Sequence, residues 1–257
     1  DLHLSLRRQR QMCIRDRVSP VQSSSYPTVL FNAMVKPWTA FPIKGVIWYQ
    51  GEANVGRPEQ YGDLFPALIT DWRRQWRSDF PFYFVQLANF MESKEIQPDS
   101  EWAALREAQT KALKLDQVGM AVTIDIGLAD DIHPKNKQEV GRRLALVALA
   151  GSYGKNVSGS APVFRNYRIK GDKMELDFGQ KQDGFQIKGT TLKGFTIAGP
   201  DRVFYPAEAM VQNGKIIVFS PEVSIPLAAR YGWADNPDCN LYGENGLPVA
   251  PFRTDCW

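Results

Sequence analysis

The sequence predicts an α/β fold followed by a β-rich module, on the basis of two observations. From Pro27 to Ala150, short apolar runs alternate with amphipathic stretches in the order strand, helix, strand, helix, strand, helix. This order, with short connections, is typical of a parallel sheet covered by helices. After Ala150, glycine and proline turn signals separate short β-type runs, and no helical periodicity persists. We therefore expect an α/β domain over residues 18–150 and a β-rich module over residues 151–257.

The elements of the α/β part follow from its hydrophobic periodicity. Three apolar runs predict buried strands, namely Ile43–Trp48, Phe82–Leu87 and Val118–Ile126. The stretches that follow these runs carry apolar residues at helical spacing. Those residues are Tyr61, Leu64, Phe65, Leu68, Trp72 and Trp76 after the first run, Trp102, Leu105 and Ala112 in a helix over Glu101–Leu115, and Val140, Leu144 and Val147 after Pro134.

The second half is predicted to begin after a linker near Gly151–Gly159, where glycine and serine are frequent. Its short runs of β-forming residues are separated by turn signals. These runs are Lys173–Phe178, Phe185–Ile187, Phe195–Ala198, Ala209–Val211 and Lys215–Phe219. We expect them to form one β-rich module of about 100 residues, a common domain size.

Composition excludes several classes of protein. The chain has 257 residues, 44% hydrophobic and 23% charged, which is the composition of a globular protein with a core. No run of roughly 18 uncharged apolar residues occurs, so we expect no membrane insertion. Residues 1–17 carry the whole net charge of +3, because they contain five arginines and two aspartates. The rest of the chain is balanced, so we expect no nucleic-acid partner.

Residues 1–17 are interpreted as a leader foreign to the fold, with a solvated basic tail as the alternative. They lack the apolar core and small-residue cleavage site of a signal peptide. His3 and Cys13 belong to this leader. The remaining cysteines, Cys239 and Cys256, could form a disulfide or remain two free thiols. Because the body of the chain has a single histidine, no Cys/His spacing indicates zinc.

That histidine, His133, is the first candidate for catalysis. It directly follows the third predicted strand and precedes a helix, so it lies at the carboxyl edge of a parallel sheet, where ligand and catalytic residues gather. Asp130 and Asp131 beside it could orient the imidazole and stabilise its protonated form. In the alternative interpretation one aspartate caps the following helix and His133 is merely exposed.

The second candidate is the segment WYQGEAN, which follows the first predicted strand and emerges at the same edge. An acyl-transfer site needs hydrogen-bond donors for a developing oxyanion. The side chains of Gln50 and Asn54 and the amide of Gly51 can supply them. Glu52 is an acceptor when ionised, so it would position other groups or bind substrate hydroxyls. An ordinary polar turn is the alternative.

Four segments resemble the sialate O-acetylesterase family, a branch of the SGNH hydrolases that deacetylates carbohydrates. They are LFNAMVKPW, IKGVIWYQGEANV, DIHPKNKQEVGRRLA and NLYGENGLPVAPFRTDCW, and the likeness covers Pro27 to Trp257. The resemblance implies a flavodoxin-like three-layer α/β domain with attached β structure. It also implies ester hydrolysis by a serine nucleophile and a histidine, without a metal or other cofactor.

On this resemblance, His133 is the general base and Asp131 or Asp130 is its partner. Asp131 begins the matching DIHP motif, whereas Asp130 has the three-residue spacing of most SGNH hydrolases. Gln50 and Gly51 become oxyanion-hole contributors, and Glu52 a conformational or substrate-binding residue. The expected partner is an acetylated carbohydrate; sialic acid, xylan and other acetylated polysaccharides all remain open, as does the oligomeric state.

The chain departs from the family at the nucleophile. Members carry a Gly-Gln-Ser-Asn-like turn well before the LFNAMV region, and this turn is absent here. Ser23, Ser24 and Ser25 lack the glycine and preceding apolar strand of a nucleophile turn. Three further serines, Ser152, Ser158 and Ser160, lie in the expected linker. We therefore expect the chain to be the C-terminal part of a longer esterase whose sheet is incomplete on its N-terminal side, and to be inactive alone.

Two other classes of function remain as alternatives. A non-catalytic carbohydrate-binding protein would use the many tryptophans and tyrosines and the β-rich module, although core packing is the favoured explanation for Trp72, Trp76 and Trp102, which fall on apolar helix faces. An interaction protein without a ligand leaves the polar edge motifs unexplained. The family and the two late cysteines favour a bacterial periplasmic or secreted location.

Overall fold

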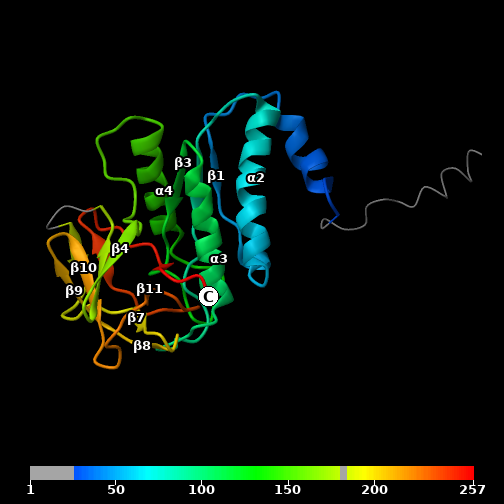
Figure 1. The fold of residues 1–257 in the computed structure, drawn as a ribbon. Helices are drawn as coiled ribbons and strands as arrows, with labels where there is room; N and C mark the ends of the chain where they lie inside the picture. Colours follow the sequence, from blue (N-terminus) through cyan, green and yellow to red (C-terminus); the bar gives the residue numbers. More distant parts are fainter. Residues whose placement is uncertain (1–25, 180–183) are drawn as a thin grey trace, which may run out of the picture. The chain divides into compact units, whose positions relative to one another are not determined.

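The computed structural model describes residues 26–179 and 184–257 (Figure 1). The predicted leader and Ser23–Ser25 lie outside the described residues. The chain divides into two compact units, Asp1–Ile43 and Lys44–Trp257. Within the described part of the first unit, a π-helical turn, η1 (Phe31–Val35), runs into a 3-10 turn, η2 (Lys36–Trp38).

The second unit begins with a parallel sheet of three strands, β1 (Val46–Trp48), β2 (Phe82–Val85) and β3 (Val118–Ala121), in that order. In the register of the sheet, Trp48 lies opposite Phe84, and Phe84 opposite Met120. The helices that follow the strands are α2 (Pro58–Trp76), α3 (Glu101–Thr110) and α4 (Lys137–Gly151). A 3-10 turn, η4 (Lys111–Lys114), continues α3. The α/β prediction is confirmed.

Alternating side chains of β2 pack against helices on both faces of the sheet, because successive residues of a strand point to opposite faces. Phe82 and Phe84 meet aromatic residues of α2; the Phe65 ring lies 5.1 Å from that of Phe84. Tyr83 points the other way, and its hydroxyl lies 2.7 Å from Ser152 Oγ at the end of α4. The strand is fully buried, as its apolar run predicts.

The rest of the unit is β-rich (Figure 1). One antiparallel sheet has the order β4-β5-β10-β9 and a second has the order β13-β11-β7-β8, while β12 pairs with β6. The bounds are β4 Asn166–Lys170, β5 Lys173–Asp177, β6 Phe185–Ile187, β7 Phe195–Ala198, β8 Phe204–Pro206, β9 Glu208–Gln212, β10 Lys215–Phe219, β11 Ala228–Tyr231, β12 Leu241–Gly243 and β13 Phe252–Arg253. All five predicted runs are strands.

Buried polar contacts join the helical and β-rich halves. Arg106 on α3 is fully buried and donates to the carbonyls of Ala234 (2.7 Å) and Asp235 (2.8 Å). At β13, Arg253 donates to Glu107 of α3 at 2.9 Å. Both halves therefore belong to the single unit Lys44–Trp257. The domain boundary near Gly151–Gly159 stays a prediction.

Three sequence expectations differ from the structure. The third strand ends at Ala121 rather than Ile126, because the chain turns at Ile124–Asp125 and the Ile126 amide donates to the Thr123 carbonyl (3.3 Å). The first strand begins only at Val46. Cys239 and Cys256 are free thiols, so the disulfide alternative is wrong. No helix within the described residues has the length and apolar character needed to cross a membrane.

Candidate active site

Three hydrogen bonds fix the loop after β1. Tyr61 and Gln109 each donate to the Gln50 carbonyl at 3.2 Å, and Gln50 Nε2 donates to Asn54 Oδ1 at 2.7 Å. A Cβ on Gly51 would lie 3.1 Å from Gln109 Nε2, a tight contact that glycine avoids. The 3-10 turn η3 (Glu52–Asn54) completes the loop.

These hydrogen bonds give the side chains of Gln50 and Asn54, the two predicted amide donors, different roles in the loop. Asn54 uses its oxygen to accept from Gln50, so its own NH₂ group is directed elsewhere. Gln50 thereby orients the Asn54 amide while its carbonyl fixes the loop to α2 and α3.

The loop after β3 carries His133 as an exposed side chain. Its side chain is 86% exposed, and its backbone amide donates to Asp131 Oδ1 at 2.9 Å. The same carboxylate oxygen lies 3.8 Å from His133 Nδ1, and Lys135 Nζ lies 3.8 Å from the other oxygen. Among the described residues, Asp130 makes no hydrogen bond or ion pair, and Asp131 is the aspartate that lies within ion-pair distance of His133.

One surface pocket brings the two loops together. It has a volume of about 380 Å³. Its lining comprises Tyr49, Gln50, Glu52, Ala53, Ile132, His133, Pro134 and Lys137. The expectation that both loops meet at the carboxyl edge of the sheet is therefore confirmed for Gln50, Glu52 and His133. Gly51, Asn54, Asp130 and Asp131 lie in these loops but do not line the pocket.

Among the lining residues that were not predicted from the sequence, Tyr49 and Lys137 carry polar groups. Lys137 Nζ lies 4.8 Å from the centre of the Tyr49 ring, within the range of a cation–π contact. Burial, with a further contribution from the charge of Glu52, raises the pKa of Tyr49 to about 12, so its hydroxyl stays a hydrogen-bond donor at neutral pH. Tyr49 adjoins the WYQGEAN glutamine, and Lys137 lies four residues after His133, which is the only sequence signal for either.

Of the three tryptophans for which core packing was considered, Trp102 is buried, and Trp72 and Trp76 are half-buried. Trp102 is 5% exposed and its indole donates to the Ala88 carbonyl at 2.8 Å. Trp72 contacts Trp48 and Trp76, each with ring centres 5.8 Å apart. Core packing therefore accounts for these three side chains.

Comparisons with known proteins point to one family. The family model for sialic acid-specific acetylesterases, a group of carbohydrate esterases, matches residues 19–150. Mouse sialate O-acetylesterase is 32% identical to the chain and aligns with 92% of it; human sialate O-acetylesterase is 32% identical and aligns with 90%. The alignments take in 49% and 50% of those relatives, so the chain spans about half of their length.

A solved structure agrees with these relatives. The crystal structure of a carbohydrate acetylesterase from Xanthomonas citri superimposes with a TM-score of 0.86 and 46% sequence identity, covering 90% of this chain and 55% of that one. The family model, the relatives and the fold lead to one conclusion. The chain belongs to the sialic acid-specific acetylesterase family of carbohydrate esterases.

Proposed function

We propose that this chain supplies the general base and the oxyanion donors of a carbohydrate O-acetylesterase that removes acetyl groups from sugar hydroxyls. The observation that carries the proposal is the pocket in which His133 faces the Gln50–Asn54 loop. Two polar loops from separate parallel strands form one site there, as expected for the carboxyl edge of such a sheet. The matching family and the Xanthomonas citri structure are both described as carbohydrate esterases, the former specific for sialic acid.

In the proposed reaction, a serine oxygen attacks the acetyl carbonyl carbon and His133 takes the serine proton. Because Nδ1 is the nitrogen nearer Asp131, Nε2 is left for this proton. The C–O bond to the sugar then breaks, and the protonated imidazole returns the proton to the departing sugar oxygen. Water attacks the acetyl-serine in the same way and releases acetate.

The oxyanion that forms at each attack needs donors rather than acceptors. Asn54, the Gly51 amide and Gln50 are the proposed donors. Glu52 would repel an oxyanion when ionised, so we assign it to a sugar hydroxyl or to the loop. Lys137 and the Tyr49 hydroxyl are further donors beside the same pocket.

We also propose that the nucleophile is not among the described residues. Ser152 Oγ is engaged with the Tyr83 hydroxyl, and Ser158 Oγ accepts from Asn245 Nδ2 at 3.0 Å. Neither these two nor Ser160 lines the His133 pocket. A base without a nucleophile in hydrogen-bond reach supports no covalent catalysis. The purified chain should therefore hydrolyse p-nitrophenyl acetate no faster than its His133→Ala variant.

The decisive experiment for the function is a chimaera. This chain replaces the aligned segment of the Xanthomonas citri enzyme, to which it is 46% identical. The chimaera should release acetate from an O-acetylated sialic acid or an acetylated xylo-oligosaccharide, and the pair of substrates identifies the preferred sugar. A folded chimaera that binds these sugars without releasing acetate would instead support the carbohydrate-binding alternative.

A further inference from the structure

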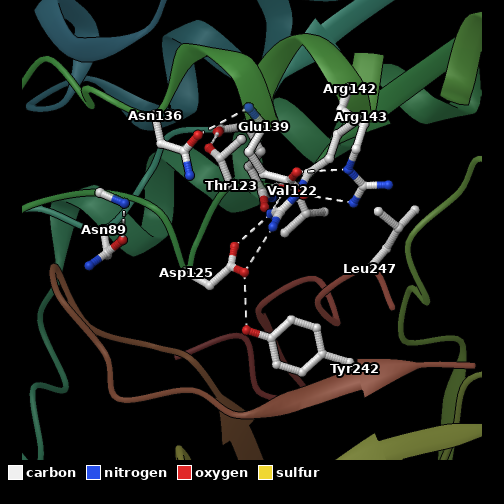
Figure 2. Close-up of polar contacts among 12 residues, drawn as sticks. Asn89, Val122, Thr123, Asp125, Asn136, Glu139, Arg142, Arg143, Tyr242 and Leu247 are labelled. Atoms are coloured by element: carbon white, nitrogen blue, oxygen red, sulfur yellow. Dashed lines mark hydrogen bonds and ion pairs between the residues drawn. The ribbon is translucent and has the colours of Figure 1, made fainter. Parts of the chain in front are cut away.

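We propose that Tyr242, acting through Asp125 and Arg143, is a positioning residue for the loop that carries His133, so that the β-rich half is part of the esterase site. The proposal rests on the role of His133 proposed above. Figure 2 shows its three members together: the Tyr242 ring rises from β12 with its hydroxyl directed at Asp125, and the Arg143 side chain reaches Asp125 from α4.

The centre of the network is a buried ion pair at the start of the loop. Arg143 Nη1 and Nη2 donate to the two oxygens of Asp125 at 2.6 and 2.9 Å, and the side chains are 5% and 10% exposed. Nη1 also donates to the carbonyl of Val122 at 2.7 Å. Bidentate pairing of this kind fixes direction as well as distance.

The same guanidinium holds the other end of the loop. Arg143 Nε donates to Glu139 Oε1 at 2.8 Å, and the Glu139 amide donates to Asn136 Oδ1 at 3.1 Å, the N-cap of α4. One side chain thus ties residues 122–125, before His133, to residues 136–139, after it. Arg143 therefore connects the two ends of the segment that carries His133, and the position of this segment depends on the orientation of the Arg143 guanidinium.

Tyr242 is the member of this network that is most distant in the sequence. It is 4% exposed, and its hydroxyl donates to Asp125 Oδ2 at 3.0 Å, across 117 residues. The hydroxyl therefore limits how the carboxylate can rotate in its pairing with Arg143. Burial and the nearby Asp125 charge raise the pKa of Tyr242, so the phenol stays a donor throughout the neutral range.

A second set of contacts fixes the part of the loop between Asp125 and His133. The Gly127 amide donates to Asn89 Oδ1 at 2.7 Å, and the Met91 amide donates to the Ala129 carbonyl at 3.1 Å. A Cβ on Gly127 would collide with the Asn89 carbonyl oxygen, so the chain is confined at this point. Beyond Ala129, Asp130 and His133 are exposed and Asp131 and Ile132 are half-buried, so the position of this part of the loop depends on these anchors.

The experiment uses the full chain and does not need catalysis. Tyr242→Phe removes one hydroxyl, and Tyr83→Phe is the matched control, because Tyr83 is also buried and its hydroxyl bonds a side chain, Ser152. Hydrogen exchange of the Gly127 and Met91 amides is measured, together with the imidazole Cε1–H NMR signal of His133. His133→Ala identifies that signal against His3.

Tyr242→Phe should accelerate exchange at Gly127 and Met91 on the order of tenfold, since one hydrogen bond to a charged group is lost. It should also shift or broaden the His133 signal. Tyr83→Phe should leave both unchanged, even if it lowers the unfolding temperature as much. A simple loss of stability would affect both variants alike, whereas a positioning role separates them.

Arg143→Lys and Arg230→Lys form a second pair, because Arg230 makes an equally buried bidentate pair with Asp255 in the β-rich half. Only Arg143→Lys should disturb the loop amides. An unchanged His133 signal and unchanged amide exchange in Tyr242→Phe would overturn the proposal. That result would leave the esterase proposal intact, and an inactive chimaera would leave this one intact.

Discussion

The side chains of Gln50 and Asn54 are coupled, because the Gln50 amide donates to the Asn54 oxygen at 2.7 Å. In the chimaera, Gln50→Ala and Asn54→Ala should each lower kcat by roughly 10², with KM nearly unchanged. The double variant should be little worse than either single variant, as expected for coupled residues. Steady-state kinetics of the three variants test this, and a purely KM effect would place both amides in substrate binding instead.

The partner of His133 is a second question at this scale. Asp131 lies 3.8 Å from Nδ1 and accepts from the His133 amide, whereas Asp130 points to no partner among the described residues. Asp131→Asn should therefore lower kcat by at least about 10², because the imidazole loses both its orientation and its charge partner. Asp130→Asn, its neighbour, serves as the control. A larger loss with Asp130→Asn would return the role to the three-residue spacing.

At the scale of elements, the first turn of α4 makes the fold sensitive to acid. Hydrogen bonds from Arg142, and then from Arg143, lower the pKa of Glu139 to about 2 from 4.5. A carboxyl with a lowered pKa stabilises the fold above its unfolded pKa, and this stabilisation is lost as pH falls through the folded pKa. The unfolding temperature should drop between pH 4.5 and 2.

Glu139→Gln should lower the unfolding temperature at pH 7 and make it less dependent on pH in the acid range, since the amide cannot titrate. Thermal unfolding followed by circular dichroism at a series of pH values measures both effects. An unchanged acid dependence in the variant would mean that Glu175, whose pKa is also lowered to about 2, and other carboxyls account for it.

The elements that the sequence predicts well are those with clear periodicity. The strands Phe185–Ile187, Phe195–Ala198 and Lys215–Phe219 have the predicted bounds. The strands β11 and β12 have no alternating pattern, because every residue in them is buried, so periodicity could not find them. β4 was missed for the opposite reason, since all five of its residues are exposed.

The site was predictable only in part for a similar reason. Loops after parallel strands meet at one edge of a sheet, and this rule correctly predicts that His133 lies beside Gln50 and Glu52. It could not find Tyr242, because the contact with Asp125 spans 117 residues and depends on how the β-rich half packs. It also could not find the pair that Arg143 forms with Asp125 beyond the end of β3, because this contact depends on how α4 packs.

At the scale of the unit Lys44–Trp257, Arg106 joins the helical and β-rich halves. It is fully buried and donates to the carbonyls of Leu87, Ala88, Ala234 and Asp235, while burial lowers its pKa to about 9. Arg106→Leu leaves these carbonyls without their donor and should lower the free energy of unfolding by about 3 kcal/mol. Urea unfolding measures the loss, with Arg74→Leu as the exposed control.

His133 is the proposed general base of an acetylesterase site to which this chain contributes two loops. The most direct measurement is acetate release from O-acetylated sugars by the chimaera, its His133→Ala variant and a Gln138→Ala variant that alters an exposed neighbour on α4. We predict that His133→Ala lowers kcat by a factor on the order of 10³ and that Gln138→Ala does not. Near-normal turnover in a folded His133→Ala chimaera would show that His133 is not the general base.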